Sequence, residues 1–354
     1  KGSAFQPGLV YDASYFDYLG FLCDAYPELF GSSADALCAS LESDGVATQA
    51  VNLNYPSIGI SSLPGTQTIT RTVTSVAKEN GWRKYKVDVD APPGYKVKVK
   101  PSSFKLKRGQ SATYEVTISN VSAPVGKWRF GSLTWRDQTK RYEAYSPIAV
   151  RAVLFDAPLE ISGQGPSGSD SFDVTFGYTG SYTAAPHGLE PATVTHSDNI
   201  VDDEEQSYDF SLSDALHFRV AMPPESTEPD VDLDLEVYDP NGDLAGLSES
   251  GDTNELIDIA EPMDGTWTVV VVGWRVPDGG VAYDMWTWAV PEASGGTLAV
   301  DSAPGAAELG TTGTVDISWS GLTGGSISDW YLGGVSHTGD SGLMAVTLVN
   351  VDNR

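Results

Sequence analysis

The stretches Lys84-Tyr-Lys-Val-Asp-Val-Asp90 and Tyr95-Lys-Val-Lys-Val-Lys100 both alternate apolar and charged residues without a break. Strict alternation is typical of a β-strand that has one face in a core and the other in water. We therefore expect the tyrosines and valines of both stretches to point inward and the lysines to point outward. The segment between them, Ala91-Pro-Pro-Gly94, has the composition of a turn.

The same pattern recurs on either side of these two stretches. Thr68–Thr74 places Ile69 and Val73 on the face opposite its threonines, and Tyr114–Ile118 repeats the alternation. About seven short strands, separated by turn residues, are typical of a sandwich of the immunoglobulin or fibronectin type-III sort. Residues 51–155 are therefore predicted to form one such domain.

Charge divides the chain into two parts. The 354 residues carry a formal net charge of −27. Residues 1–155 hold 18 Lys+Arg and 13 Asp+Glu, whereas residues 156–354 hold 3 Lys+Arg and 35 Asp+Glu. This shift indicates a domain boundary near Asp156. The acidic charge argues against nucleic acid or an anionic membrane surface as a partner. No stretch approaches the roughly 18 apolar residues of a spanning helix, so we expect no membrane span.

The acidic part, residues 156–354, carries further strand patterns and almost no helix signal. Its predicted strands are Ser171–Phe176, Tyr208–Leu212, Ala215–Ala221, Val231–Tyr238, Thr266–Gly273, Ala282–Val290, Thr314–Ser318, Tyr331–Val335 and Leu343–Val351. Tyr238-Asp-Pro-Asn-Gly-Asp243 predicts a tight hairpin turn, because Pro240 fixes φ and Gly242 permits a positive φ. We expect either one large jelly-roll-like sandwich or two smaller ones.

Residues 8–42 instead carry helix signals. Asp12 can cap a helix whose apolar residues recur at the spacing of one helix face, namely Tyr15, Tyr18, Leu19 and Leu22. Ser32 with Asp35 has the spacing of a capping box at the start of a second helix that ends near Leu41. The predicted fold class is thus mainly β: tandem β-sandwiches, fibronectin-type-III-like and then jelly-roll-like, after a short helical N-terminal segment.

The two cysteines, Cys23 and Cys38, allow two interpretations. They are either free buried thiols or, in an extracellular protein, a disulfide worth roughly 3 kcal/mol in the loop-entropy model. No paired Cys-x-x-Cys, His-Glu-x-x-His or Cys/His cluster occurs, so the sequence indicates neither zinc nor a redox dithiol.

Five ordered blocks resemble the C-terminal region of secreted subtilisin-like serine proteases. They are Pro7-Gly-Leu-Val-Tyr-Asp12 with Asp17-Tyr-Leu-Gly-Phe-Leu-Cys23, then Leu53-Asn-Tyr-Pro-Ser-Ile58, Arg71-Thr-Val-Thr-Ser-Val76, Gly126-Lys-Trp-Arg-Phe-Gly-Ser-Leu-Thr-Trp135 and Ser146-Pro-Ile-Ala-Val150. The resemblance implies that residues 1–50 are the helical end of the catalytic domain and that residues 51–155 are its fibronectin-type-III-like neighbour. It also implies a secreted, extracellular protein, in which we expect Cys23 and Cys38 to form a disulfide.

Within the acidic region, residues 197–291 resemble the pre-peptidase C-terminal β-sandwich that is appended to many secreted bacterial proteases. The resemblance rests on Asp232-Leu-Asp-Leu-Glu-Val-Tyr-Asp-Pro-Asn-Gly242, Asn254-Glu255 and Gly265-Thr-Trp-Thr-Val-Val270. The strands of 156–196 and 297–354 would then complete a separate sandwich around this module.

The chain lacks the catalytic residues of the family that it resembles. Subtilases use Asp, His and Ser in that order, all before the segment that begins here at Gly8. Gly339-Asp-Ser-Gly342 matches the nucleophile string of trypsin-like proteases, and His337 is close in sequence. We interpret this match as a turn, because a triad is defined by geometry and not by adjacent letters. We assign no catalytic residue and expect no peptide hydrolysis by this chain.

Calcium is the one cofactor that the sequence suggests. Asp230, Asp232 and Asp234 offer hard oxygen ligands two residues apart, which share one face of a strand, and Asp202–Glu205 forms another acidic cluster. The alternative is an acidic surface that increases solubility. Trp286 and Trp288 also share a strand face, either as core residues or as an exposed aromatic platform.

Two functions follow from these observations. The first is the non-catalytic C-terminal part of a secreted subtilisin-like serine endopeptidase, which stabilises its own catalytic domain and also contacts protein substrate or a surface. The second is a carbohydrate-binding or adhesive extracellular module. The ordered blocks favour the first function, whereas exposed coplanar tryptophans would favour the second.

Overall fold

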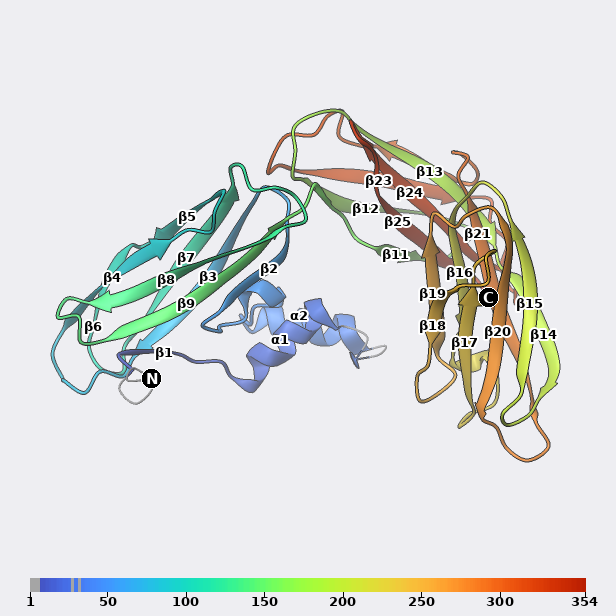
Figure 1. Cartoon of the computed structure of the whole chain (residues 1–354), viewed down its shortest axis with the longest axis horizontal. Coiled ribbons are helices and arrows are strands. Elements are labelled where there is room, and N and C mark those ends of the chain that lie inside the picture. Colours follow the sequence, from blue (N-terminus) through green and yellow to red (C-terminus); the bar gives the residue numbers. More distant parts are fainter. Residues whose placement is uncertain (1–6, 27–28, 31–32) are drawn as a thin grey trace. The chain divides into compact units, whose positions relative to one another are not determined.

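The computed structural model describes residues 7–26, 29–30 and 33–354, and it divides into two compact units. Unit 1 comprises Lys1–Asp156 with Thr175–Thr179 and Glu308–Thr311, and unit 2 comprises the remaining residues. Both units are built mainly from β-strands, as predicted (Figure 1). Within the described residues, no helix is both long and apolar enough to cross a membrane.

Unit 1 contains a sandwich of two sheets. The first sheet has the order β1-β3-β7-β5 and the second the order β2-β9-β8-β4-β6. The strands are β1 (Leu9–Tyr11), β2 (Ile58–Leu63), β3 (Thr66–Ser75), β4 (Arg83–Asp90), β5 (Tyr95–Lys100), β6 (Ser103–Leu106), β7 (Ser111–Asn120), β8 (Trp128–Asp137) and β9 (Glu143–Ala152). A further strand, β10 (Phe155–Asp156), pairs with Thr175 and Phe176.

The alternation in the sequence positions the core of this sandwich. Tyr85, Ile69 and Tyr114 are buried between the sheets, where the rings of Tyr114 and Trp135 meet edge to face at 5.0 Å. The lysines of β4 and β5 are exposed, as the alternation predicted. Burial of large aromatic side chains from both sheets therefore stabilises the domain.

Two helices precede this sandwich in the chain: α1 (Tyr15–Ala25) and α2 (Ala34–Ser43), followed by the short 3₁₀ turn η3 (Ala50–Asn52). The prediction that Asp12 caps the first helix is wrong. Ser14 caps it instead, with its side chain on the backbone N–H of Asp17 while the Asp17 carboxylate accepts from the Ser14 N–H at 2.6 Å. This reciprocal box satisfies two backbone donors, which a lone Asp12 would not do. The predicted second start at Ser32 lies outside the described residues.

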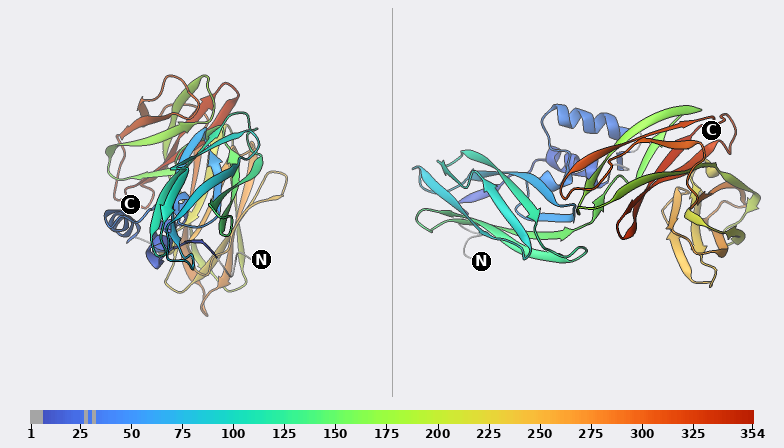
Figure 2. Two further views of the ribbon diagram at one scale, coloured as in Figure 1. Left: turned by 90° about the vertical axis from the view of Figure 1, so that its left-hand side faces the viewer. Right: turned by 90° about the horizontal axis from the view of Figure 1, so that it is seen from above.

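Unit 2 contains two sandwiches, each built from two sheets, and one sandwich interrupts the other in sequence (Figure 2). The outer sandwich pairs the sheet β12-β23-β22, which β10 extends at its edge, with the sheet β11-β25-β24-β13. Its strands are β11 (Glu160–Gly163), β12 (Ser167–Phe176), β13 (Tyr182–Pro191), β22 (Leu298–Ser302), β23 (Thr312–Ser320), β24 (Trp330–Gly339) and β25 (Gly342–Asp352). The strands on both sides of residues 193–291 thus complete one sandwich.

The inserted sandwich has its own core. Its sheets run β14-β21-β16-β19 and β15-β20-β17-β18. Its strands are β14 (Thr193–Ile200), β15 (Glu205–Leu212), β16 (Ala215–Met222), β17 (Asp232–Tyr238), β18 (Leu244–Ser248), β19 (Glu255–Ala260), β20 (Gly265–Arg275) and β21 (Val281–Pro291). The predicted turn joins β17 to β18, with Gly242 at φ 83° and the Asn241 N–H bonded to the Asp239 carboxylate at 2.8 Å.

Candidate functional site

The Gly339-Asp-Ser-Gly342 string forms the turn between β24 and β25. Asp340 in this turn accepts hydrogen bonds from the backbone N–H and the hydroxyl of Ser181. His337 is buried, with Nδ1 2.8 Å from the Tyr182 hydroxyl and Nε2 3.0 Å from that of Thr347. Burial lowers the pKa of His337 to about 4. Both ring nitrogens of His337 therefore contact groups other than Ser341, and the string does not assemble a nucleophile with its base.

A serine and a histidine that the sequence did not single out do meet in unit 2. The Ser336 hydroxyl lies 2.9 Å from Nε2 of His187, beside a pocket of about 460 Å³. Both residues are buried. A hydrolytic pair needs a third group that orients the histidine. Among the described residues, however, Nδ1 of His187 has no hydrogen-bond partner, so the pair lacks the carboxylate that would orient it.

An ionic network around the buried Arg219 connects the inserted sandwich to β11. Arg219 on β16 donates from Nε to Asp258 at 2.7 Å and from Nη2 to Glu160 at 2.5 Å. Nε2 of His217 lies 2.6 Å from the same Asp258 oxygen. Burial alone would raise the pKa of Asp258, but the hydrogen bonds from His217 and Arg219 lower it to about 2. Asp258 is thus a partly exposed carboxylate, 33% accessible at its side chain, whose charge is compensated by the buried Arg219.

The three calcium candidates occupy different environments. Asp230 is exposed in a turn with φ 66°, whereas Asp232 and Asp234 on β17 are only 1% and 6% exposed. Burial, followed by the charges of Asp232 and Glu255, raises the pKa of Asp234 to about 6. Among the described residues, no three His, Cys, Asp or Glu side chains are already arranged to hold a metal ion.

The other acidic cluster, Asp202–Glu205, serves the turn between β14 and β15. The Asp202 carboxylate accepts from the backbone N–H of Val276 at 2.9 Å, and Glu204 accepts from that of Val201 at 2.9 Å. Hydrogen bonds from Gln206 and from that backbone lower the pKa of Glu204. These acids act as local caps of an exposed turn.

The paired tryptophans are core residues and not a platform. Trp286 and Trp288 on β21 are each 2% exposed. They pack with Ala221, Leu332 and Leu348 where the two sandwiches of unit 2 meet. The indole N–H of Trp288 donates to the backbone carbonyl of Trp330 at 2.9 Å, so their polar edges are satisfied as well.

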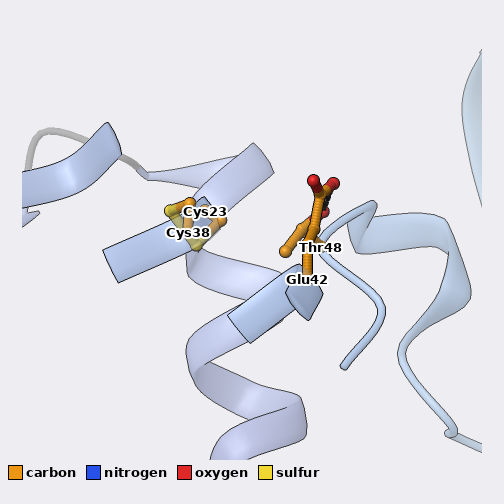
Figure 3. The surroundings of a disulfide bond; sticks show 4 residues. All are labelled: Cys23, Cys38, Glu42 and Thr48. Atoms are coloured by element: carbon orange, nitrogen blue, oxygen red, sulfur yellow. Dashed lines mark hydrogen bonds between the residues drawn. A yellow bond between two sulfur atoms is a disulfide. The ribbon is translucent and has the colours of Figure 1, made fainter. Parts of the chain in front are cut away.

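The helical segment of unit 1 is held by a disulfide between Cys23 and Cys38, which joins α1 to α2 (Figure 3). The Thr48 hydroxyl donates to the Glu42 carboxylate at 2.6 Å beside it. Asp24 near the end of α1 accepts from the backbone N–H of Ala50 at 2.8 Å. These contacts fix the helices to the chain that enters the sandwich.

A buried arginine anchors that same entry. Arg71, which the sequence analysis did not single out, sits on β3 between the inward residues Ile69 and Val73. Its guanidinium donates to backbone carbonyls of Val51 at 2.8 Å and Tyr55 at 3.0 Å. Burial lowers the pKa of Arg71. In the sequence, Arg71 occupies an inward position of an alternating strand, and this unusual placement could have predicted a buried arginine.

Helix α1 exposes aromatic side chains. Tyr15 is 71% and Phe16 58% exposed, and Tyr18 is also exposed. Within the described part of α1, Gly20 is the residue that is buried. Gly20 lies against Val46 and Ala47, where an added Cβ would come within 2.4 Å of a carbonyl oxygen. A helix normally buries its apolar stripe, whereas this one presents an apolar surface that the described residues of the chain leave exposed.

Comparison with known proteins finds relatives for the N-terminal part of the chain. A fibronectin type-III domain model matches residues 52–150. The chain is 38% identical over 164 residues to the CO(2)-response secreted protease of Arabidopsis thaliana, covering 42% of this chain and 20% of that protein. It is 34% identical over 154 residues to subtilisin-like serine-protease S of Lotus japonicus, covering 43% and 19%. The chain thus spans about a fifth of the length of these relatives.

Among solved structures, the secreted serine protease VesC from Vibrio cholerae matches 68% of this chain and 49% of its own, at 11% identity and a TM-score of 0.23. At that TM-score the likeness carries no argument. The sequence comparisons, in contrast, confirm the resemblance to the C-terminal region of secreted subtilisin-like serine proteases. The chain contains the fibronectin type-III domain of that kind of protease.

Proposed function

We propose that this chain is the non-catalytic C-terminal part of a secreted, extracellular subtilisin-like serine endopeptidase and that it stabilises its own catalytic domain. The observation that carries the proposal is the exposed aromatic surface of α1, formed by Tyr15, Phe16 and Tyr18. Exposed apolar clusters on a folded protein mark interaction sites. The relatives suggest what this partner is, because they are proteases and about four fifths of their length lies outside the matched region.

The construction of unit 1 supports this role. The disulfide, the Asp24 hydrogen bond and the Arg71 anchor hold the helices to the sandwich. A partner that covers Tyr15 and Phe16 would therefore be coupled to the fibronectin type-III domain through a pre-organised connection. Pre-organisation lowers the entropic cost of association, which is how such a domain could stabilise a neighbour without contributing catalytic groups.

Binding between this chain and the catalytic domain encoded with it, produced separately, tests the proposal. The double variant Tyr15→Ser with Phe16→Ser should weaken binding at least tenfold, since buried interface aromatics typically contribute more than 1 kcal/mol each. Trp274→Ser is the matched control, because Trp274 is an equally exposed aromatic in unit 2. Equal affinities for all three proteins would contradict the proposed surface.

A contact with protein substrate or another surface is the second part of the proposal. It is supported by Trp128, Phe130 and Tyr145, which are exposed on the neighbouring strands β8 and β9. The carbohydrate-binding alternative loses its main support, because Trp286 and Trp288 are buried. Two binding assays on the wild type and on the double variant Trp128→Ala with Phe130→Ala separate these functions. If the wild type binds insoluble polysaccharide and the variant does not, the carbohydrate-binding alternative is favoured. If the wild type binds unfolded casein and the variant does not, substrate contact is supported.

A further inference from the structure

Strand β17 carries two acidic residues in an unusual place. Leu233 and Leu235 point into the core of the inserted sandwich. Because side chains alternate along a strand, Asp232 and Asp234 share the opposite face. That face of a sheet normally meets solvent, yet both aspartates are almost fully buried.

The two carboxylates are left partly unpaired. Within the part of the chain that the structure describes, Oδ1 of Asp232 and Oδ1 of Asp234 have no hydrogen-bond partner. The nearest cation is Arg275, whose Nη1 lies 3.3 Å from Oδ2 of Asp232. The Arg275 side chain is itself 61% exposed and donates to the backbone carbonyl of Gly251 at 3.1 Å. Among the described residues, the solvated guanidinium of Arg275 is therefore the cation that compensates the negative charge of Asp232 and Asp234.

A third buried acid adds to the negative charge. Glu255, at the start of β19, is 1% exposed. The Ser250 backbone N–H donates to Glu255 at 2.8 Å, and the Ser248 hydroxyl donates to its other oxygen. Both carboxylate oxygens of Glu255 therefore accept hydrogen bonds, and the charge of Glu255 contributes to the raised pKa of Asp234. Of these three buried carboxylates, Asp232 is the one that the structure pairs with the partly exposed Arg275.

Residues 156–354 hold no other cationic side chain that could serve here. The region contains three arginines and no lysine. Arg219 is bound to Asp258 and Glu160, and Arg354 is bound to Asp352 and Glu225. Burying a carboxylate without a counter-charge costs several kcal/mol, so the charge must be supplied from outside the chain.

We propose that Oδ1 of Asp232 and Oδ1 of Asp234 bind a calcium ion on the outer face of β17. Calcium prefers hard oxygen ligands and completes its shell with backbone carbonyls and water, so two carboxylates suffice as anchors. Glu255 increases the local negative charge without needing to bind the metal. Asp230, being exposed, is not part of this site. The inference is independent of the proposed protease function.

Thermal unfolding of the full chain, followed with and without calcium, tests the site. Extracellular modules bind calcium at roughly 0.1–1 mM, so we use about 5 mM CaCl₂ against EDTA. The midpoint of the unit 2 transition should rise by roughly 3–8 °C with CaCl₂. Sodium chloride at equal ionic strength should give at most a small part of this rise. Magnesium should also do less, because it requires a near-ideal octahedral shell.

Two variants locate the effect. Asp234→Asn should abolish the calcium-dependent rise, whereas Glu205→Gln should retain it. Glu205 is the matched control because it is an exposed acid in the same row of this sheet: both Glu205 and Asp234 pair with Val272. If Asp234→Asn does not fold, Asp232→Asn replaces it. Calorimetric titration of the wild type with CaCl₂ should show one site that Glu205→Gln preserves.

Three results would overturn the inference. They are a calcium shift in Asp234→Asn equal to that of the wild type, a shift reproduced by sodium chloride, and the absence of calcium binding in the titration. In the last case the buried pair retains a proton instead of a metal ion.

Discussion

The two units differ in what they leave unsatisfied. Unit 1 exposes the aromatic side chains of α1, while its buried cation, Arg71, is satisfied by backbone carbonyls. Unit 2 covers Trp286 and Trp288 but buries Asp234 without a cation of its own. An uncovered apolar surface indicates an absent protein, whereas an uncompensated buried charge indicates an absent ion. The two proposals therefore assign partners of different chemistry to the two units of one chain.

Unit 2 also contains the counterexample that makes this comparison testable. The side chain of Asp258 is 33% exposed, and hydrogen bonds from His217 and Arg219 lower its pKa to about 2. Asp234 is only 6% exposed, and burial and neighbouring acids raise its pKa to about 6. The two acids therefore differ both in burial and in the presence of a buried cation beside them.

The largest effect is expected from Arg219→Met. The substitution leaves Asp258 and Glu160 without their buried cation. Because these two side chains are 33% and 29% exposed, we expect a cost of about 3 kcal/mol, the lower end of the range for breaking a buried pair. Chemical denaturation of the full chain measures the loss in the unit 2 transition. Arg136→Met is the control, since Arg136 forms exposed pairs with Asp88 and Glu143 worth at most about 1 kcal/mol. Equal costs for the two variants would show that the network is not a stabilising element.

Acid should weaken unit 2 through His337. Its folded pKa of about 4 lies below the usual value of 6.5, so between these values the unfolded chain binds more protons. The His337 contribution to the free energy of unfolding should therefore fall by about 3 kcal/mol as pH decreases from 6.5 to 4. Asp234, whose pKa is raised to about 6, binds its proton in the folded state over the same range and opposes this fall, so the effect of His337 is measured as the difference between wild type and variant. His337→Gln should remove this loss.

His196→Gln provides the control for the acid transition. The hydrogen bond with Asp284 raises the pKa of exposed His196, so protonation of this histidine favours the folded state. The variant should keep the loss between pH 6.5 and 4. Identical pH profiles for the wild type and His337→Gln would contradict the assignment to His337.

Removing the disulfide should act on the helices of unit 1 alone. Cys23→Ser with Cys38→Ser opens a loop closed over 15 residues, which corresponds to about 2–3 kcal/mol in the loop-entropy model. Hydrogen exchange should accelerate in α1 and α2 and stay unchanged in β3 and β7. A matching acceleration in these strands would mean that the helices and sandwich unfold as one cooperative unit.

The smallest effect is expected from Tyr15→Ser with Phe16→Ser. These side chains are already exposed, so the isolated chain should change in stability by less than about 0.5 kcal/mol. Thermal unfolding of the chain gives the value. A cost above 2 kcal/mol would mean that the aromatics stabilise unit 1 itself, and the comparison between the units would fail.

The sequence predicted well which face of a strand is buried, but it predicted poorly which side chains contact one another. Alternation placed Tyr85, Ile69 and Val73 in the core, because one buried face imposes a period of two. It did not predict β13 or β14, whose polar and proline-containing segments are strands because neighbouring strands pair with them. Local propensity does not contain that information.

For the candidate sites, the sequence likewise predicted the residue types but not their environments. The acidic residues Asp230, Asp232 and Asp234 indicated a cluster, but only the fold shows that Asp230 is exposed and that the other two are buried. The Asp258–Arg219–Glu160 network joins residues far apart in the chain, so no spacing rule could have predicted it.

Reading the coding sequence upstream of Lys1 tests the central claim most directly. If the chain is the C-terminal part of a subtilisin-like protease, the open reading frame should encode a catalytic domain with Asp, His and Ser in that order. Its last helices should continue into Gly8 and α1. An uninterrupted reading frame that encodes no such domain would contradict the proposed function.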